Sequence, residues 1–446
     1  MGMRLMVIFL AIGSAHVAAA RTWTEAGSGK QIEAEFVSSD GVSATIGVAG
    51  GRRFTLPLAR LSPEDQAFVR QQQQQPQPGD MKSKAPGRRD AKAEDRFEEV
   101  PRLTAGKIPV KGKADGALRA VDEAIQRVMA EKGIPALTFA LSKDGKILHD
   151  RAFGWADADL KKELEPGVKM RVASMTKPVV SAAIRTLFQD KKLKPEDLVF
   201  DLLELGECKE ATSCDPRFKA VTIEHLLEHK GGWDRDKSGD LTTRSTAITE
   251  LFRVKPQELE PNHIVRYGLT QPMDFDPGER SVYCNFGYIL LVRVIEKVSG
   301  QKFVDYLHNT IGKVSGAESF SASSSDARDR QAGEIWYCYH PEYAQKEVPL
   351  SFRTEARDGA GVLACTAADY CRFLEAYWIS GEVRDKSQRG YSFNGSHPGV
   401  TAVCAQRADG ISYAAIANRR ESGKANWNSD LRKAIDAALE EAAKGL

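Results

Sequence analysis

The clearest chemical signal in this chain of 446 residues is the run Arg171-Val172-Ala173-Ser174-Met175-Thr176-Lys177-Pro178. An apolar helix body over 179–188 follows, so Ser174 and Lys177 stand three residues apart at a helix start and face the same way. The helix dipole favours negative charge at the serine oxygen, and the unpaired backbone N–H of that serine can stabilise an oxyanion. A lysine acts as a base only when burial or a neighbouring cation lowers its pKa. By itself the pattern also fits a helix cap beside a solvated charge, so a catalytic interpretation requires further catalytic residues elsewhere in the chain.

A second motif, Tyr283-Cys284-Asn285, supplies candidate partners. It follows the turn Asp276-Pro277-Gly278 and precedes an apolar helix that begins near Ile289. In an extended backbone, residues two apart project to the same side. Tyr283 can then relay a proton while Asn285 orients a substrate in the same cleft. Alone, the motif would also fit a buried tyrosine and a loop asparagine. It indicates a catalytic site only because it follows the Ser174 motif in this order along the chain.

The segments that flank these motifs predict one antiparallel sheet. A helix with apolar residues at helical spacing, capped by Asp115, opens the region, and an amphipathic helix closes it. Because each helix adjoins a hairpin, the two hairpins can share a sheet. The fold class is therefore α+β, an antiparallel sheet flanked by helices, with an inserted and mostly helical part at about 174–390. The hairpins are 135–142 with 146–153, joined by Asp144-Gly145, and 401–406 with 412–418, joined by Asp409-Gly410.

These separated motifs, taken in order, resemble the serine β-lactamase and penicillin-binding-protein family, closest to its class C, D-alanyl-D-alanine peptidase and esterase members. The resemblance runs from about 133 to 418. It implies a β-lactamase/transpeptidase-like fold and a serine hydrolase in which Ser174 forms an acyl-enzyme. Lys177 and Tyr283 would handle the protons, Asn285 would orient the substrate, and water would release the acid. The further runs that carry it are Val221-Thr222-Ile223-Glu224-His225-Leu226-Leu227-Glu228-His229 and Gly359-Ala360-Gly361-Val362.

The third motif departs from the family pattern, which is usually Lys or His, then a small or polar residue, then Gly. The best match is Phe393-Asn394-Gly395, followed by Ser396. Gly395 permits close backbone approach, and the N–H of Ser396 is a candidate second oxyanion donor. Phe393 removes the cation that commonly binds a substrate carboxylate, so we expect ester or amide cleavage rather than efficient β-lactam hydrolysis. If Phe393 is instead a core residue, His397 stands nearer the cleft.

Other functions remain open at this point. A true β-lactamase or a D-alanyl-D-alanine carboxypeptidase would use the same nucleophile, whereas a non-catalytic cell-envelope binding protein would use only the fold. His225-Leu226-Leu227-Glu228-His229 fits a short zinc-protease pattern. Because Lys230-Gly231-Gly232 ends that helix and no third ligand is evident, we expect neither a metal nor an organic cofactor. An α/β-hydrolase is disfavoured because the chain has no G-x-S-x-G motif.

The N-terminal part predicts export and a separate module. Residues 1–20 combine a basic start, a short apolar run and Ala18-Ala19-Ala20, which is typical of a cleavable secretory signal, so we expect a secreted or periplasmic protein. Residues 21–70 read as short strands and resemble the SH3-like Sla-homology module, a small β-barrel that either binds a cell-envelope ligand or acts as a spacer. The glutamine-rich and charged stretch 71–114 predicts a flexible linker, which leaves 115–446 as the catalytic domain.

Charge and cysteine content narrow the partners. The formal net charge of +2 gives no electrostatic reason to expect nucleic acid, so the partner is a small-molecule or peptide substrate. Export places the seven cysteines where disulfides form, and Cys208 and Cys214 lie close together in a polar loop. We predict a disulfide between these two, and the odd total leaves at least one thiol free or intermolecular. The remaining cysteines are expected to be small buried side chains: Cys284, Cys338, Cys365, Cys371 and Cys404.

Overall fold

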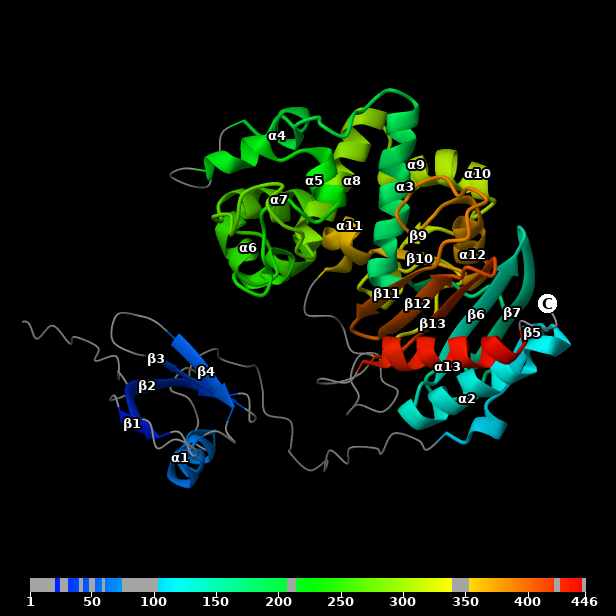
Figure 1. The fold of residues 1–446 in the computed structure, drawn as a ribbon, viewed down its shortest axis with the longest axis horizontal. Coiled ribbons are helices and arrows are strands. Elements are labelled where there is room, and N and C mark those ends of the chain that lie inside the picture. Colours follow the sequence, from blue (N-terminus) through cyan, green and yellow to red (C-terminus); the bar gives the residue numbers. More distant parts are fainter. Residues whose placement is uncertain are drawn as a thin grey trace, which may run out of the picture. The chain divides into compact units, whose positions relative to one another are not determined.

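The computed structural model describes residues 21–24, 31–39, 43–47, 53–57, 61–73, 103–206, 214–338, 353–420 and 426–442. The predicted signal segment 1–20, Cys208 and linker residues 74–102 lie outside the described residues. The chain divides into two compact units, 1–94 and 95–446, and each is described by itself (Figure 1). Among the described helices, none is long and apolar enough to cross a bilayer.

The first unit is a four-stranded antiparallel sheet with one helix. The strands follow one another in chain order, and the indole N–H of Trp23 donates to the carbonyl of Ala34 at 3.0 Å inside a small apolar core. Ser62 caps the helix through a 3.2 Å hydrogen bond from the N–H of Asp65. The described strand pairs join only consecutive strands, so closure into an SH3-like barrel stays a prediction. The elements are β1 (Arg21–Thr24), β2 (Gln31–Ser39), β3 (Ser43–Gly47), β4 (Arg53–Pro57) and α1 (Pro63–Gln73).

A six-stranded sheet, in which every neighbouring pair is antiparallel, forms the base of the second unit. Its strand order is β11-β12-β13-β6-β7-β5. Both predicted hairpins are confirmed, and the pairing of β13 with β6 joins them in the middle of the sheet. The strands are β5 (Val110–Lys113), β6 (Ala136–Lys143), β7 (Lys146–Gly154), β11 (Tyr391–His397), β12 (Val400–Gln406) and β13 (Ile411–Ala417).

The edge strand β5 corrects the expected domain start. It lies within 71–114, which the sequence assigned to the linker, yet it pairs with β7 and belongs to the second unit. Its residues Val110-Lys111-Gly112-Lys113 carry no alternating apolar pattern, because an edge strand needs little burial. The predicted cap is also displaced: Asp115 accepts the N–H of Ala117 at 3.0 Å and caps a short 3-10 turn that precedes α2 (Arg119–Lys132).

Helices cover both faces of the sheet. Alternate side chains of β6 point to opposite faces, so Leu137 and Phe139 contact α2 and α13 (Trp427–Ala442), whereas Ala136 and Ala140 belong to the core under α3 and α12. Figure 1 shows α2 and α13 lying side by side on their face. The opposite face carries the larger core and the helical insertion.

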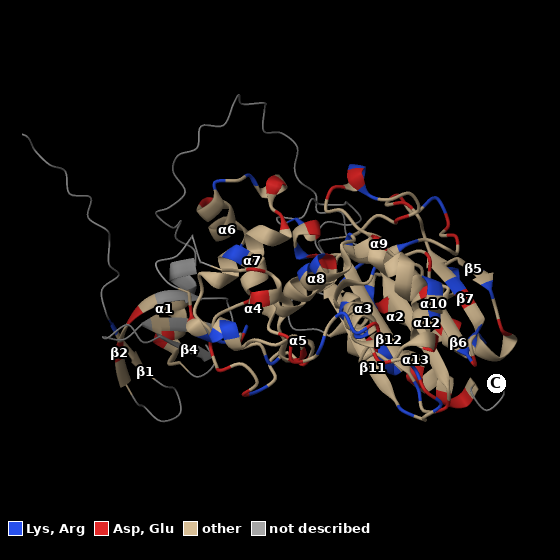
Figure 2. Ribbon diagram, turned by 90° about the horizontal axis from the view of Figure 1, so that it is seen from above, with Lys and Arg blue, Asp and Glu red and all other residues tan. Residues whose placement is uncertain are grey.

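The insertion between β7 and β11 is mostly helical, as predicted, and includes a small antiparallel sheet of order β8-β10-β9. In the view of Figure 2, acidic and basic residues mix over the second unit. The helices are α3 (Thr176–Gln189), α4 (Val199–Leu202), α5 (Ile223–Leu227), α6 (Ser245–Phe252), α7 (Pro261–Leu269), α8 (Asn285–Ser299), α9 (Phe303–Leu307), α10 (Lys313–Ser315), α11 (Asp358–Gly361) and α12 (Ala367–Ala376). The strands are β8 (Met170–Arg171), β9 (Ser321–Ala322) and β10 (Leu363–Cys365).

The cysteines follow the sequence prediction where the structure describes them. Cys214 is disulfide-bonded, while its predicted partner Cys208 lies outside the described residues. The other five cysteines are all buried, as the sequence predicts. They are Cys284, Cys338, Cys365, Cys371 and Cys404.

Candidate active site

Ser174 lies in a one-turn 3-10 helix, Ala173–Met175, which leads directly into α3. The residue before it, Ala173, has a φ of 48°, in the left-handed region, which costs a non-glycine residue about 1–3 kcal/mol. Two glycines, which have no side chain, allow their backbone to pack directly against this turn. A Cβ at Gly395 would overlap the carbonyl oxygen of Val172, and a Cβ at Gly361 would press on the backbone of Ala173. A strained turn held in this way is typical of a functional site.

The amine of Lys177 is buried against three oxygen atoms. The residue is only 1% exposed, and its Nζ lies 3.3 Å from Ser174 Oγ, 2.8 Å from Asn285 Oδ1 and 3.2 Å from the carbonyl oxygen of Ala360. Burial, followed by the charge of Arg357, lowers the pKa of Lys177 to about 7. A neutral amine has two N–H bonds, which Asn285 and Ala360 can accept. Its lone pair is then left for the hydroxyl of Ser174, so Lys177 can act as its base near neutral pH.

The hydroxyl of Tyr283 donates to Ser174 Oγ at 2.7 Å. Burial raises the pKa of Tyr283 to about 12, although the hydrogen bond with Ser174 lowers it. The phenol therefore keeps its proton at neutral pH. The guanidinium of Arg235 lies 4.9 Å from the ring centroid, a cation–π contact, and the amine of Lys177 lies 4.8 Å from it. Tyr283 is thus a proton donor in direct contact with the nucleophile.

Asn285 is oriented by a carboxylate that the sequence analysis did not identify. Its Nδ2 donates to Asp240 Oδ2 at 2.6 Å while its Oδ1 faces Lys177. An ionised carboxylate only accepts, so it fixes which end of the amide meets the lysine. Burial disfavours ionisation of Asp240, but Arg357 and hydrogen bonds from Asn285 and Thr242 outweigh burial and hold the pKa of Asp240 below its usual value. Asp240 therefore links the amide to a cation.

Asp240 and Arg357 carried no functional signal in the sequence. Asp240 precedes Leu241-Thr242, which predicts only a cap, and its side chain does accept the N–H of Thr242 at 3.0 Å. Arg357 ends the 3-10 turn Thr354–Arg357; its Nη2 lies 3.5 Å from Asp240 Oδ2 and its Nε donates to Thr242 Oγ1 at 3.1 Å. These residues are 117 apart in the chain, so only the folded structure brings them together.

A cavity of about 270 Å³ opens beside Ser174. Most of its lining side chains are small, and the larger ones are those of two arginines, a histidine and an asparagine. None of the lining residues is acidic. A cavity of this size is smaller than most sites for drug-sized ligands, which span roughly 300–1,000 Å³. The lining residues are Ala173, Ser174, Thr243, Asn285, Thr354, Arg357, Ala360, Gly361, Ser396, His397, Pro398 and Arg420.

The third motif is only partly where the sequence placed it. Ser396 lines the cavity, and Gly395 makes the predicted close approach, but Phe393 and Asn394 are not among the lining residues. Phe393 is half-buried against the core, and its carbonyl accepts from the thiol of Cys404. Only the C-terminal end of β11 reaches Ser174, and there His397 lines the cavity, as the alternative interpretation of this strand predicted. Burial, and then Arg357, lowers the pKa of His397 well below its usual value, so this imidazole is neutral.

The two histidines of the zinc pattern, His225 on α5 and His229 just after it, each accept a backbone hydrogen bond at Nδ1. His225 Nδ1 accepts the N–H of Thr222 at 3.3 Å in a capping box. His229 Nδ1 accepts the N–H of Cys284 at 3.1 Å, and its ring packs 4.8 Å from that of Tyr283. Burial, followed by the charge of Lys177, lowers the pKa of His229 to about 4. Across the described residues, no group of three or more His, Cys, Asp or Glu side chains is placed to hold a metal ion.

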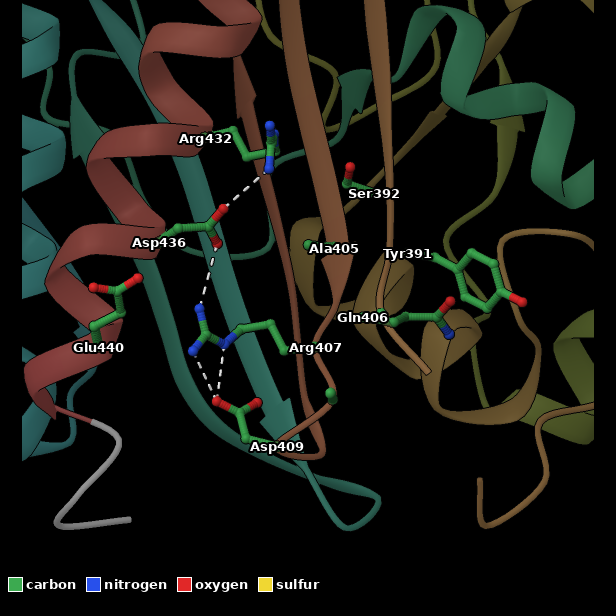
Figure 3. A pocket seen from close by; sticks show the side chains of 11 residues that line it. Tyr391, Ser392, Ala405, Gln406, Arg407, Asp409, Arg432, Asp436 and Glu440 are labelled. Atoms are coloured by element: carbon green, nitrogen blue, oxygen red, sulfur yellow. Dashed lines mark hydrogen bonds and ion pairs between the residues drawn. The ribbon is translucent and has the colours of Figure 1, made fainter. Parts of the chain in front are cut away.

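A second and more open cavity, of about 560 Å³, lies between β11, β12 and α13 and contains none of the candidate catalytic residues (Figure 3). Both of its arginines are paired with carboxylates. Arg407 lies 2.8 Å from Asp409 and 3.6 Å from Asp436, and Arg432 lies 3.2 Å from Asp436. Figure 3 shows this chain of ion pairs spanning the cavity from the turn to the helix. The arrangement is that of a structural network at the sheet edge.

A family model, curated relatives and solved structures match parts of this chain. The family model described as Beta-lactamase matches residues 121–426. The chain is 35% identical over 161 residues to a probable fimbrial assembly protein, FimD, of Dichelobacter nodosus, which is 36% of this chain and 37% of that relative. The chain thus spans little more than a third of the length of this curated relative.

Two solved structures share the fold. The octameric penicillin-binding protein homologue from Pyrococcus abyssi has a TM-score of 0.55 at 19% identity, over 72% of this chain and 76% of that chain. The D-amino acid amidase from Ochrobactrum anthropi SV3, in complex with D-phenylalanine, has a TM-score of 0.56 at 17% identity, over 73% of this chain and 99% of that chain. At these identities the likeness concerns the fold alone.

Proposed function

Because the chain belongs to the beta-lactamase family of serine hydrolases, we propose that it cleaves an ester or amide through an acyl-enzyme at Ser174. The observation that carries the proposal is the position of Ser174 Oγ, 3.3 Å from the amine of Lys177 and 2.7 Å from the hydroxyl of Tyr283. A base and an acid therefore contact the same nucleophile.

In the acylation step, Lys177 takes the proton of Ser174 and Oγ forms a bond to the substrate carbonyl carbon. The carbon–leaving-group bond then breaks, Tyr283 delivers a proton to the departing oxygen or nitrogen, and the proton that Lys177 took up passes to Tyr283. The balance is one serine ester formed and one alcohol or amine released. Asn285 holds Lys177 toward Ser174 and stands at the cavity wall, where it can orient the substrate.

In the deacylation step, water attacks the serine ester, and its proton passes to the Lys177 and Tyr283 pair as Ser174 regains its own. The carbonyl oxygen becomes negative in both steps. We assign its stabilisation to the backbone N–H groups of Ser174 and Ser396, because both residues line the cavity beside the nucleophile.

The substrate class within this chemistry is an ester or amide. An altered third motif supports esterase or amidase activity over efficient β-lactam hydrolysis, since Ser396 and the neutral His397, the β11 residues that line the cavity, supply no cation. The fold is shared with a D-amino acid amidase and a penicillin-binding protein homologue, so amides of D-amino acids and D-alanyl-D-alanine peptides belong in the substrate panel beside β-lactams.

Hydrolysis of a short-chain p-nitrophenyl ester tests the proposal. We expect Ser174→Ala to abolish turnover and Ser387→Ala, at an exposed serine, to leave turnover unchanged. Intact mass after brief exposure to esters, β-lactams and D-amino-acid peptides should show one acyl adduct on the wild type and none on Ser174→Ala. If Ser174→Ala is as active as the wild type, the acyl-enzyme mechanism at Ser174 is refuted. Neither turnover nor an adduct with any substrate would favour the non-catalytic cell-envelope binding protein.

We further propose that the protein is exported and that its N-terminal module, 21–70, binds a cell-envelope ligand. The basic and apolar residues of 1–20 support export, and the four-stranded sheet with its capped helix supports a separate module. Fractionation of expressing cells, followed by N-terminal sequencing, should find a mature chain that begins at Arg21. A cell-associated chain that retains residues 1–20 would contradict cleavage.

A further inference from the structure

A short turn before Asp240 carries an arginine, Arg235. The N–H of Gly239 donates to the carbonyl of Arg235 at 3.0 Å, so the backbone between them closes like one turn of a helix. The N–H of Asp234 donates to a carboxylate oxygen of Asp274 at 2.9 Å, which fixes the start of the turn to a neighbouring segment. The turn that supplies the carboxylate of the active site thus also holds a guanidinium group.

The guanidinium of Arg235 contacts the aromatic ring that bears the catalytic hydroxyl. It lies over the ring of Tyr283, 4.9 Å from the centroid, which is within the range of a cation–π contact. The hydroxyl of the same ring donates to Ser174 Oγ at 2.7 Å. Arg235 is exposed and Tyr283 is partly buried. The ring therefore lies between an exposed cation and the nucleophile.

No acidic side chain offsets the charge of Arg235 in the described part of the chain, where this arginine takes part in no ion pair. Two neighbouring cations differ in this respect. Lys237, on the same turn, lies 3.6 Å from Asp274, and Arg280 lies 2.8 Å from Glu279. A carboxylate beside a cation weakens its effect on other groups, because the two charges act with opposite sign.

The other groups around Tyr283 do not replace this cation. Besides Arg235, the titratable or charged groups that act on the ring or its hydroxyl are Ser174, Lys177, His229, Asp240, Tyr288 and Arg357. The histidine and the second tyrosine are neutral, since burial lowers the pKa of the first to about 4 and raises that of the second to about 12. Arg357 lies 3.5 Å from Asp240, so these two charges offset one another. Lys177 becomes a cation near neutral pH when it accepts the serine proton.

Building on the proposed function, we propose that Arg235 is a positioning residue that acts through Tyr283, by stabilising the phenolate that forms when Tyr283 protonates the leaving group. The O–H bond of Tyr283 breaks as its proton bonds to the departing oxygen or nitrogen, and the proton that Lys177 took from Ser174 then restores the phenol. Arg235 neither gives nor takes a proton. The charge of a phenolate spreads into the ring, so a cation over the ring attracts the phenolate more strongly than the phenol. Such a difference between the two states lowers the barrier.

Two esters with the same acyl group test this inference. An ethoxide needs a proton to depart, whereas p-nitrophenolate departs readily without one, so ethyl butyrate depends more on Tyr283 than p-nitrophenyl butyrate does. The measured quantity is the ratio of kcat/KM for ethyl butyrate to that for p-nitrophenyl butyrate. Both values are taken at about pH 9, where Lys177 is neutral because its pKa is about 7. Both esters give the same acyl-enzyme, so the ratio reports the departure of the leaving group.

Arg235→Gln should lower this ratio by about twofold to fivefold, the size of a cation–π contact at an exposed site. Arg235→Lys keeps a cation and should retain most of the ratio. In a Tyr283→Phe background, Arg235→Gln should lower the ratio no further, because the arginine acts through the phenol. The control is Lys237→Gln, which removes a cation of the same turn that pairs with Asp274 and should leave the ratio unchanged. Thermal melting of each variant checks folding.

The outcomes separate this inference from the proposed function. A ratio that Arg235→Gln leaves unchanged, or lowers equally in the Tyr283→Phe background, overturns the role of Arg235. Cleavage of the p-nitrophenyl ester alone also overturns it, because Tyr283 would then not protonate a leaving group. If Ser174 is still acylated in any of these cases, the proposed hydrolase remains. Absence of turnover and of acylation with both esters in the wild type would refute the hydrolase, and with it the role of Arg235.

Discussion

Asp240→Asn is the sharpest test of how this site is organised. In the wild type, the carboxylate of Asp240 accepts from Asn285 Nδ2 and so forces Asn285 Oδ1 toward Lys177. An amide at 240 can donate or accept, so it no longer dictates the orientation of Asn285. Asparagine caps helices as well as aspartate does, so the variant should keep the turn that begins at Leu241. The substitution therefore tests the orientation of the Asn285 amide without disturbing the fold of the turn.

The structure indicates two effects of this variant, one on kcat and one on the pKa of Lys177. Turning the amide of Asn285 would set an N–H group against the amine of Lys177, which costs about 1–3 kcal/mol, or roughly tenfold to hundredfold in kcat. The negative charge of Asp240 also raises the pKa of Lys177. Removing it should lower that pKa below about 7. The acid limb of the pH profile should therefore move to lower pH while the plateau falls.

The assay measures kcat and kcat/KM for a neutral p-nitrophenyl ester between about pH 5 and pH 9. This range covers the acid limb of the pH profile, which Lys177 should place near neutrality. Asp236→Asn, an exposed neighbour on the same loop, is the matched control and should match the wild type in both quantities. Circular dichroism and melting establish that both variants fold. A plateau within twofold of the wild type together with an unmoved acid limb would refute the role assigned to Asp240.

Three more results are expected. Wild-type kcat/KM should rise as pH increases through about 7, because the neutral amine of Lys177 is the active form, whereas a pH-independent rate would argue against this base. Gly395→Ala should lower stability by about 1–3 kcal/mol and reduce activity, since its Cβ would overlap the carbonyl of Val172. Gly390→Ala, whose Cβ would lie 3.9 Å from the carbonyl oxygen of Gln406, should melt like the wild type. Phe393→Lys should not create hydrolysis of a chromogenic cephalosporin, because residue 393 does not line the cavity; a clear gain would show that it does.

The sequence predicted the parts of this molecule that local patterns govern. The two Asp-Gly turns were enough to place both hairpins, and their pairing through β13 and β6 follows from burying one sheet between helices. The strand β5 was missed because an exposed edge strand buries too little to need an apolar pattern. Ser174, Lys177, Tyr283 and Asn285 were identified as a group, and the structure brings them into contact.

The residues that balance charge around this group could not be predicted. Asp240 resembles any helix cap, and Arg357 and Arg420 resemble any solvated arginines, until the fold brings them to one cavity. His397 was only an alternative to Phe393, because the position where β11 reaches Ser174 depends on how the strand packs against Val172. Local patterns thus identify groups that react, whereas the groups that set their protonation are a property of the tertiary structure.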